Sequence, residues 1–155
     1  MDKNSLIKFV RCVKCFSQEL QSVGDFAQCS SCGGKYLYKD GKIFFSEVPS
    51  DAKMHDEAKK FDRVFSVQRK GAIDYFKRIL EKEDSSKIFC DIGVGTDRLQ
   101  DLKDKFHTKI GLDFVPYSAV SIVADFTKPL PLRDNSVDIV FITEVLEHIP
   151  TPPLL

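Results

Sequence analysis

Two cysteine pairs constrain the fold of this chain more than any other feature of its sequence. Cys12 and Cys15 form the first pair, Cys29 and Cys32 form the second, and 13 residues separate the pairs. Four thiolates in two such pairs match the ligand set of a tetrahedral zinc site. Because the four cysteines would fill the coordination sphere, we predict a structural zinc ion rather than a catalytic one. Two disulfides or uncoordinated thiols are the alternatives.

The residues around the cysteines predict a small β structure over residues 1–48. The run YLYKDGKIFF reads as two strands around Asp40-Gly41, a dipeptide that favours a hairpin turn. Gly33-Gly34 follows the second pair and can supply the positive φ that a metal-binding turn often needs. A unit of this size buries little apolar surface, so metal binding is expected to supply most of its folding energy.

Composition places the chain among globular proteins, with 43% hydrophobic and 30% charged residues. No apolar run approaches the ~20 residues that a membrane-spanning helix needs, and the N-terminus lacks the apolar core of a secretory signal. We therefore predict a cytoplasmic location without a membrane partner, where reduced thiols favour metal binding. The formal net charge is zero, so no broad positive field for nucleic acid exists, although a local basic patch stays possible.

The rest of the chain divides into a helical segment at 49–86 and an alternating α/β segment at 87–155. In the helical segment, apolar residues recur at three- and four-residue steps and form one face. In the second segment, strands that alternate with helices or loops favour a parallel sheet. Cys90 lies inside the first strand and is expected to be a buried core thiol. The strands are expected at 88–92, 108–114, 121–124 and 137–143, with a helix at 97–106; the apolar helical face comprises Ala58, Phe61, Phe65, Ile73, Phe76 and Leu80.

A glycine turn follows the first of these strands. Gly93 and Gly95 leave the backbone open to a ligand, because glycine has no Cβ. Asp113 ends the second strand, where a carboxylate can accept both hydroxyls of a ribose. We expect the carboxylates of Asp91, Asp113 and Asp125 to converge at the carboxyl edge of the sheet, where open α/β sheets bind ligands.

From Ile88 to Pro153, the chain resembles the class I methyltransferases that use S-adenosylmethionine (SAM). The resemblance implies an α/β fold with a partial Rossmann-like parallel sheet, here preceded by a small β zinc ribbon. Together with the residue patterns before it, this gives three parts: a zinc ribbon at 1–48, a helical linker at 49–86 and an incomplete SAM-binding half-domain at 87–155. The matching features are Asp91-x-Gly93-x-Gly95, Asp113, Asp125 with Leu130-Pro131-Leu132, the run Asp134–Phe141, and Glu144–Ile149 with its Leu-Glu-His segment.

The resemblance also implies a role for each of these residues. Gly93 and Gly95 would pass along the methionine part of SAM, and Asp91 would steady that loop. His148, the one imidazole near the strand ends, is the candidate catalytic base. In the alternative, the aspartates only cap turns and His148 only begins a helix. The remaining contacts would be Asp113 with ribose, Asp125 and the Phe126 amide with adenine, and a carbonyl at Thr143 or Glu144 with the SAM ammonium.

Three features depart from the family pattern. The usual third glycine is Asp97, which either caps the following helix or repels the methionine carboxylate. Residues 115–120 are too few for a crossover helix, since a parallel crossover needs about a dozen residues. The family's sheet has seven strands, whereas this chain ends after four. We therefore expect an apolar edge at 137–143 and a truncated chain, a fragment, or a sheet completed by a partner chain.

The methyl acceptor is either a small molecule or RNA. Thr143–Leu146 stands where methyltransferases of exocyclic amines carry an Asn/Asp-Pro-Pro-aromatic segment, so that class is disfavoured. Balanced charge favours a small molecule. The segment Cys29–Tyr36 is similar to ribbons that precede ribosomal RNA guanine-N1 methyltransferase domains and to free-standing ribbons that activate methyltransferases, which favours RNA or a protein partner. The alternative function is a non-catalytic zinc-ribbon module with a residual SAM-binding half-domain, and a third possibility is a ribbon that binds nucleic acid.

Overall fold

The computed structural model describes residues 1–48, 70–95, 104–143 and 145–149. Most of the helix expected at 97–106, the Asp97 cap, the Glu144 contact and the helical pattern before residue 70 lie outside these residues. The described elements are α1 (Lys3–Ile7), β1 (Leu20–Val23), β2 (Phe26–Cys29), β3 (Lys35–Lys39), β4 (Lys42–Phe44), α3 (Lys70–Leu80), β5 (Ile88–Ile92), β6 (Thr108–Asp113), β7 (Ile122–Val123), β8 (Ile139–Ile142) and the 3-10 helix η1 (Leu146–His148).

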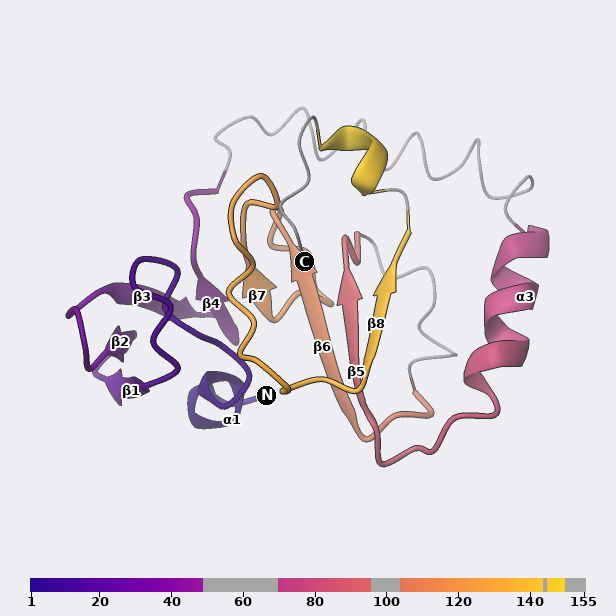
Figure 1. Ribbon diagram of the computed structural model, residues 1–155, viewed down its shortest axis with the longest axis horizontal. Helices are drawn as coiled ribbons and strands as arrows, with labels where there is room; N and C mark the ends of the chain where they lie inside the picture. Colours follow the sequence, from indigo (N-terminus) through magenta and orange to yellow (C-terminus); the bar gives the residue numbers. More distant parts are fainter. Residues whose placement is uncertain (49–69, 96–103, 144, 150–155) are drawn as a thin grey trace.

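The strands form one sheet in the order β1-β2-β3-β4-β7-β6-β5-β8 (Figure 1). β1 to β4 pair antiparallel, whereas the pairs β4–β7, β7–β6, β6–β5 and β5–β8 are all parallel. The first strand of the parallel part, β5, thus lies between β6 and β8, which is the order of a doubly wound α/β sheet. The α/β class and the Rossmann-like parallel arrangement predicted from the sequence are confirmed.

The cysteine-bearing part is not a separate sheet. Ile43 of β4 stands opposite Ile122 of β7, and Phe44 stands opposite Val123. The Ile43 amide donates to the Ser121 carbonyl at 3.0 Å, and the Phe45 amide donates to the Val123 carbonyl at 2.8 Å. The antiparallel strands therefore extend the parallel sheet at its β7 edge.

The predicted hairpin around Asp40-Gly41 is confirmed. Lys39 of β3 pairs with Lys42 of β4, which leaves a two-residue loop. Asp40 has a φ of 51° and Gly41 a φ of 77°, the pair of positive values that a type I′ turn requires. The twist of this turn matches the twist of the strands on either side, which explains why Asp-Gly stands here.

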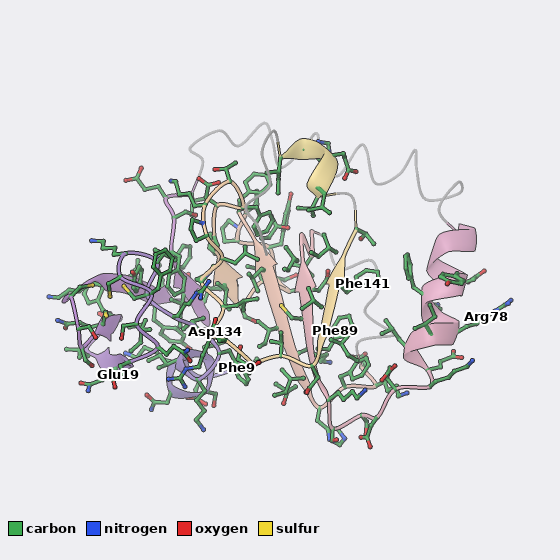
Figure 2. All side chains as sticks on the ribbon, in the orientation of Figure 1. Phe9, Glu19, Arg78, Phe89, Asp134 and Phe141 are labelled. Atoms are coloured by element: carbon green, nitrogen blue, oxygen red, sulfur yellow. The ribbon has the colours of Figure 1, made fainter. Side chains whose placement is uncertain are left out.

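A second connection joins the N-terminus to the loop after β7. Val10 forms an antiparallel bridge with Leu132. The Arg11 amide donates to the Pro131 carbonyl at 2.8 Å, and the Arg133 amide donates to the Phe9 carbonyl at 2.8 Å. Figure 2 shows Phe9 and Asp134 close to this junction. The start of the chain is thus hydrogen-bonded to the segment that precedes β8.

One face of the sheet is covered by the N-terminal segment. Leu6 of α1 and Val10 are completely buried, and they belong to the same apolar cluster as Ile43, Cys90 and Leu112. Burial of such side chains contributes about 1.5–3 kcal/mol each. The N-terminal part therefore shares its core with the parallel sheet. The expectation that metal binding supplies most of its folding energy stays a prediction.

The opposite face carries an aromatic cluster under α3. Phe89 of β5 stacks on Phe106 with ring centroids 5.0 Å apart, and Phe76 of α3 meets Phe141 of β8 edge-on at 5.0 Å. Leu80 completes the cluster and is buried. Figure 2 labels Phe89 and Phe141 on neighbouring strands. The inward positions predicted for Phe76 and Leu80 are confirmed, and Phe106 is buried with them.

The connection from β6 to β7 contains no helix, as its length predicted. The chain turns at Tyr117, and the Val120 amide donates to the Tyr117 carbonyl at 3.1 Å. This loop passes so close to β6 that a Cβ on Gly111 would lie 2.3 Å from the Ala119 carbonyl oxygen. Val115 and Val120 are buried, so the short loop itself covers the sheet there.

β8 is the last strand of the sheet in the described part of the chain. Its Val140 side chain is 50% exposed, as expected for an apolar edge. The completion of this edge by a partner chain stays a prediction. Among the described residues, no helix is long and apolar enough to cross a bilayer.

Candidate metal centre and cofactor-binding edge

The four cysteines predicted as metal ligands come together in one cluster. Their sulfur atoms all lie within 4.8 Å of one another. The Cys12 and Cys32 sulfurs are 3.5 Å apart, and the Cys15 and Cys29 sulfurs are 3.6 Å apart. A zinc–sulfur bond of about 2.3 Å in a tetrahedral site places sulfurs about 3.8 Å apart. The cluster is therefore positioned to bind a metal ion, and the thiols are free rather than joined in disulfides.

Each cysteine pair lies on a tight turn of the same form. The Phe16 amide donates to the Cys12 carbonyl at 3.0 Å, and the Gly33 amide donates to the Cys29 carbonyl at 2.9 Å. Phe16 and Gly33 both have positive φ, at 59° and 71°. The positive φ expected at Gly33 is confirmed. The equivalent position of the first turn is occupied by phenylalanine, a residue that rarely adopts this conformation.

Tyr36 supports the cluster from β3, and the sequence analysis did not identify it. Its hydroxyl lies 3.0 Å from the Cys12 sulfur and accepts a hydrogen bond from the Val13 amide at 3.1 Å. Burial raises the pKa of Tyr36, so the hydroxyl keeps its proton and can donate it to a thiolate. Only the strand register, which turns Tyr36 to the same face as the cysteines, identifies this role. The ring is held by Phe45, with centroids 4.3 Å apart.

The Cys12 thiol lies in surroundings that favour its ionised form. Burial acts to raise its pKa, but hydrogen bonds from the Tyr36 hydroxyl and from the amides of Cys15 and Lys14 outweigh burial and lower the pKa to about 6. The Lys14 amide is 3.4 Å from the Cys12 sulfur. Donors that point at a sulfur stabilise the thiolate, which is the form that binds metal.

The glycine turn after β5 is bound to the end of β6. Gly93 and Gly95 both have positive φ, at 77° and 54°. The Gly93 amide donates to the Leu112 carbonyl at 2.8 Å, and the Gly95 amide donates to Oδ2 of Asp113 at 2.9 Å. Oδ1 of Asp113 accepts from the Val115 amide at 3.0 Å. The Asp113 carboxylate therefore joins the glycine turn to the start of the β6–β7 loop.

Asp91 and Asp113 lie near the carboxyl ends of neighbouring parallel strands. Asp91 stands opposite Gly111, two residues before Asp113. Both carboxylates are nearly buried, with 5% and 4% of the residue exposed. The structure thus places Asp91, Gly93, Gly95 and Asp113 at the same end of two neighbouring strands. The convergence of the Asp91, Asp113 and Asp125 carboxylates stays a prediction. Their roles toward a cofactor stay predictions.

Val145 lies directly over Gly93. A Cβ on Gly93 would be 2.1 Å from Cγ2 of Val145, whereas a Cβ on Gly95 would meet its nearest atom at 3.9 Å. Val145 is buried and immediately precedes η1, which lies beyond the tips of β5 and β8 in Figure 1. The segment after β8 therefore packs onto the glycine turn. Position 93 requires glycine for two reasons: its φ is positive, and a side chain there would collide with Val145.

Asp125 follows β7 and makes a local turn. Its Oδ1 accepts from the Thr127 amide at 2.9 Å and from the Thr127 hydroxyl at 2.6 Å. Its Oδ2 lies 3.1 Å from the Lys128 ammonium. Hydrogen bonds from Thr127, with a smaller contribution from Lys128, lower the pKa of Asp125 despite partial burial. These contacts fit the turn-capping alternative, while the adenine role stays a prediction together with that of Phe126, which is buried beside it.

The remaining candidates differ in their surroundings. His148 is exposed at the end of η1. Cys90 is completely buried, which raises its pKa to about 12, so its thiol is a core residue as predicted. Glu144 lies outside the described residues.

Comparison with known proteins agrees with this arrangement. Residues 90–155 match a family model described as "Methyltransferase domain". No curated protein matches the chain. The strand order, the glycine turn and this match define a class I methyltransferase domain, the class that transfers methyl groups from SAM. The chain carries this domain over its C-terminal part, behind a four-cysteine cluster positioned for a metal ion.

Proposed function

We propose that this chain binds SAM at the carboxyl edge of β5 and β6 and is part of an enzyme that methylates RNA or a small molecule. The observation that carries the proposal is the Asp113 carboxylate, which accepts from the Gly95 amide at 2.9 Å and from the Val115 amide at 3.0 Å. This pair of hydrogen bonds fixes a negative charge beside a turn that has no side chains at two positions. A fixed anion next to bare backbone suits a ligand that presents ribose hydroxyls.

The residues at this edge offer the hydrogen-bond acceptors and the open backbone that would suit SAM. Asp113 would accept hydrogen bonds from the ribose hydroxyls, and the Gly93–Gly95 backbone would lie along the methionine part. Asp91, buried one strand away, would add negative charge near the ammonium group. A Cβ on Gly95 would have space around it, so the turn is open at that residue. Val145 fills the space over Gly93 and limits how a ligand approaches there.

The adenine end is assigned to Asp125 and the Phe126 amide. Asp125 already bonds to Thr127 and Lys128, so adenine would compete with the exposed Lys128 ammonium for Oδ2. A carbonyl at Thr143 or Glu144 would face the ammonium group. SAM supplies an electrophilic methyl group when bound, and the main contribution of the protein is to place the acceptor in line with it. His148 is the candidate base for an acceptor that must lose a proton.

We further propose that the metal is zinc and that its role is structural. All four ligands would be cysteine sulfurs, which leaves no position for a water molecule or a substrate. The ion would hold the two turns against β3 and, through β4, the edge of the parallel sheet.

Calorimetric titration of the zinc-loaded chain with SAM tests the cofactor proposal. We expect binding, and we expect Asp113→Asn to weaken it at least tenfold while the protein stays folded. Asp74→Asn is the matched control, because Asp74 is an exposed carboxylate on α3 and its loss should leave SAM affinity unchanged. The absence of binding at millimolar SAM would refute the cofactor site.

Transfer of a labelled methyl group separates the enzyme from the non-catalytic alternative. The zinc-loaded chain would be incubated with methyl-labelled SAM and either total RNA or a small-molecule extract. Label in one of these fractions supports the enzyme, and His148→Ala would then reduce the rate if His148 is the base. Tight SAM binding without transfer to either fraction favours the binding module.

A further inference from the structure

The exposed face of the antiparallel strands combines lysines with apolar side chains. Along β3, Lys35, Leu37 and Lys39 face solvent, whereas Tyr36 between them is buried toward the cysteines. β4 repeats the pattern, with Ile43 buried and Lys42 and Phe44 on the other side. We call this surface the ribbon face, defined by Phe26, Lys35, Leu37, Lys39, Lys42 and Phe44.

The strand register arranges the apolar members of the ribbon face in one row. Phe26 of β2 stands opposite Leu37 of β3, and Leu37 stands opposite Phe44 of β4. Phe26 and Leu37 are 38% and 40% exposed, and Phe44 is half-buried. The Lys35 ammonium lies 5.8 Å from the centre of the Phe26 ring. The exposed Phe26 ring thus lies on an open sheet within reach of a cation, in one row with Leu37 and the half-buried Phe44.

The lysines of the ribbon face lie close together and give this surface an excess of positive charge. Lys39 and Lys42 stand directly opposite each other, a like-charge pair that destabilises an antiparallel sheet. These two lysines line a groove that has a volume of about 730 Å³. Lys14 and Lys35 line it as well. Asp40 and Glu47 also line it, so positive charges outnumber negative ones four to two. This excess stands out in a chain of zero net charge.

The groove leads from the ribbon face toward the proposed cofactor edge. Pro116 lines the groove and lies three residues after Asp113, on the loop whose Val115 amide bonds to the Asp113 carboxylate. Phe44 packs against the cluster of Val120 and Val123 beneath that loop. A ligand that follows the groove would therefore pass from the lysines to the loop beside the proposed ribose site.

We propose that the ribbon face docks single-stranded RNA and directs it toward the methyl-donor site. Lysines along a groove contact phosphates, and exposed aromatic side chains stack on unpaired bases, which is how open sheets bind single strands. A small-molecule acceptor would need neither the cations nor the exposed Phe26 ring. As an assignment of the acceptor class, the inference rests on the proposed function; as a docking surface, it does not.

Fluorescence anisotropy with a labelled single-stranded RNA and the full zinc-loaded chain tests the docking surface. We expect a plot of the logarithm of the affinity against the logarithm of the salt concentration to have a slope of about −3. This value corresponds to phosphate contacts by the four groove lysines, Lys14, Lys35, Lys39 and Lys42. Lys39→Ala/Lys42→Ala should reduce that slope by about 1.4. Phe26→Ala should weaken binding about tenfold with little change in slope, because stacking does not release counterions.

The matched control is Arg78→Ala/Lys82→Ala, which removes the same charge from the far end of the molecule. Both residues are exposed, and Figure 2 shows Arg78 on α3, well away from the antiparallel strands. This variant should bind RNA like the unmodified chain. Zinc content and circular dichroism of each variant establish that the fold is retained.

Several results would overturn the inference. RNA binding that is absent at low salt, that is insensitive to salt, or that is reduced equally by the control variant would remove the docking surface. Tighter binding of DNA of the same sequence or of an acidic protein would remove the assignment to RNA. SAM binding without RNA binding would refute this inference alone, and RNA binding without SAM binding would refute the proposed function alone.

Discussion

The Tyr36 hydroxyl lies 3.0 Å from the Cys12 sulfur and 3.1 Å from the Val13 amide nitrogen. One side chain of β3 therefore joins the sheet to a ligand of the metal cluster and to the turn that carries it. Tyr36 is 4% exposed, so no water competes effectively for its hydroxyl. Such supporting contacts orient metal ligands and tune their affinity.

Tyr36→Phe is expected to lower zinc affinity about 10- to 100-fold, because it removes the hydroxyl that donates to Cys12 and leaves the Val13 amide unsatisfied. The ring and its contact with Phe45 are retained, so the fold should persist. Competition with a chromophoric chelator measures the affinity. Tyr38→Phe is the control, since that hydroxyl bonds weakly to the Met1 carbonyl at 3.4 Å. Equal zinc affinity in the two variants would contradict the supporting role.

Removal of the metal is expected to disturb the parallel sheet as well as the cysteine turns. The Arg133 amide, which belongs to the segment before β8, bonds to the Phe9 carbonyl, and the Ile43 amide bonds to the Ser121 carbonyl. Hydrogen exchange with and without chelator should therefore show faster exchange at Ile43 and Arg133. Protection that persists at Arg133 while the Tyr38 amide of β3 exchanges freely would show that the two parts unfold independently.

Gly93 and Val145 should be coupled energetically. Gly93→Ala meets both an unfavourable φ, which costs about 1–2 kcal/mol, and the side chain of Val145. Val145→Ala removes the collision but not the unfavourable φ. In a double-mutant cycle followed by urea denaturation, Gly93→Ala should therefore destabilise the Val145→Ala protein less than the unmodified protein, by about 1 kcal/mol or more. The cycle with Gly95→Ala should be additive, because a Cβ there has space. Additivity in both cycles would mean that Val145 does not pack on Gly93.

Gly111→Ala is expected to lower the free energy of unfolding by about 1–3 kcal/mol, because the added Cβ would lie 2.3 Å from a backbone oxygen that cannot move easily. Gly71→Ala is the control within the same chain. Gly71 lies in α3 with nothing near its added Cβ, so the change should be neutral or stabilise the protein by up to about 1 kcal/mol. Urea denaturation measures both, and equal stability of the two variants would contradict the tight loop crossing.

Local sequence patterns predicted much of the fold and of the candidate site. Apolar runs located the strands, since burial on both faces demands them, and Asp40-Gly41 located its hairpin because few dipeptides accept two positive φ values. The cysteine spacing identified the four residues that form the cluster positioned for a metal ion. The glycine turn and Asp113 were both recognised from the sequence, and the structure joins them by a hydrogen bond. Each of these features depends on residues that are close together in the chain, so it can be predicted from the local sequence.

The tertiary structure decided which distant segments meet. Nothing near Ile43 indicates that it pairs with Ile122, and nothing near Val10 indicates a bridge to Leu132. Tyr36 and Val145 likewise gained their roles through strand register and packing across the sheet. The sequence by itself determined the elements and the chemistry of the candidate ligands. Only the packed structure determined that the cysteine turns and the parallel sheet share one core, because long-range pairing follows from burial of the whole chain and not from any local pattern.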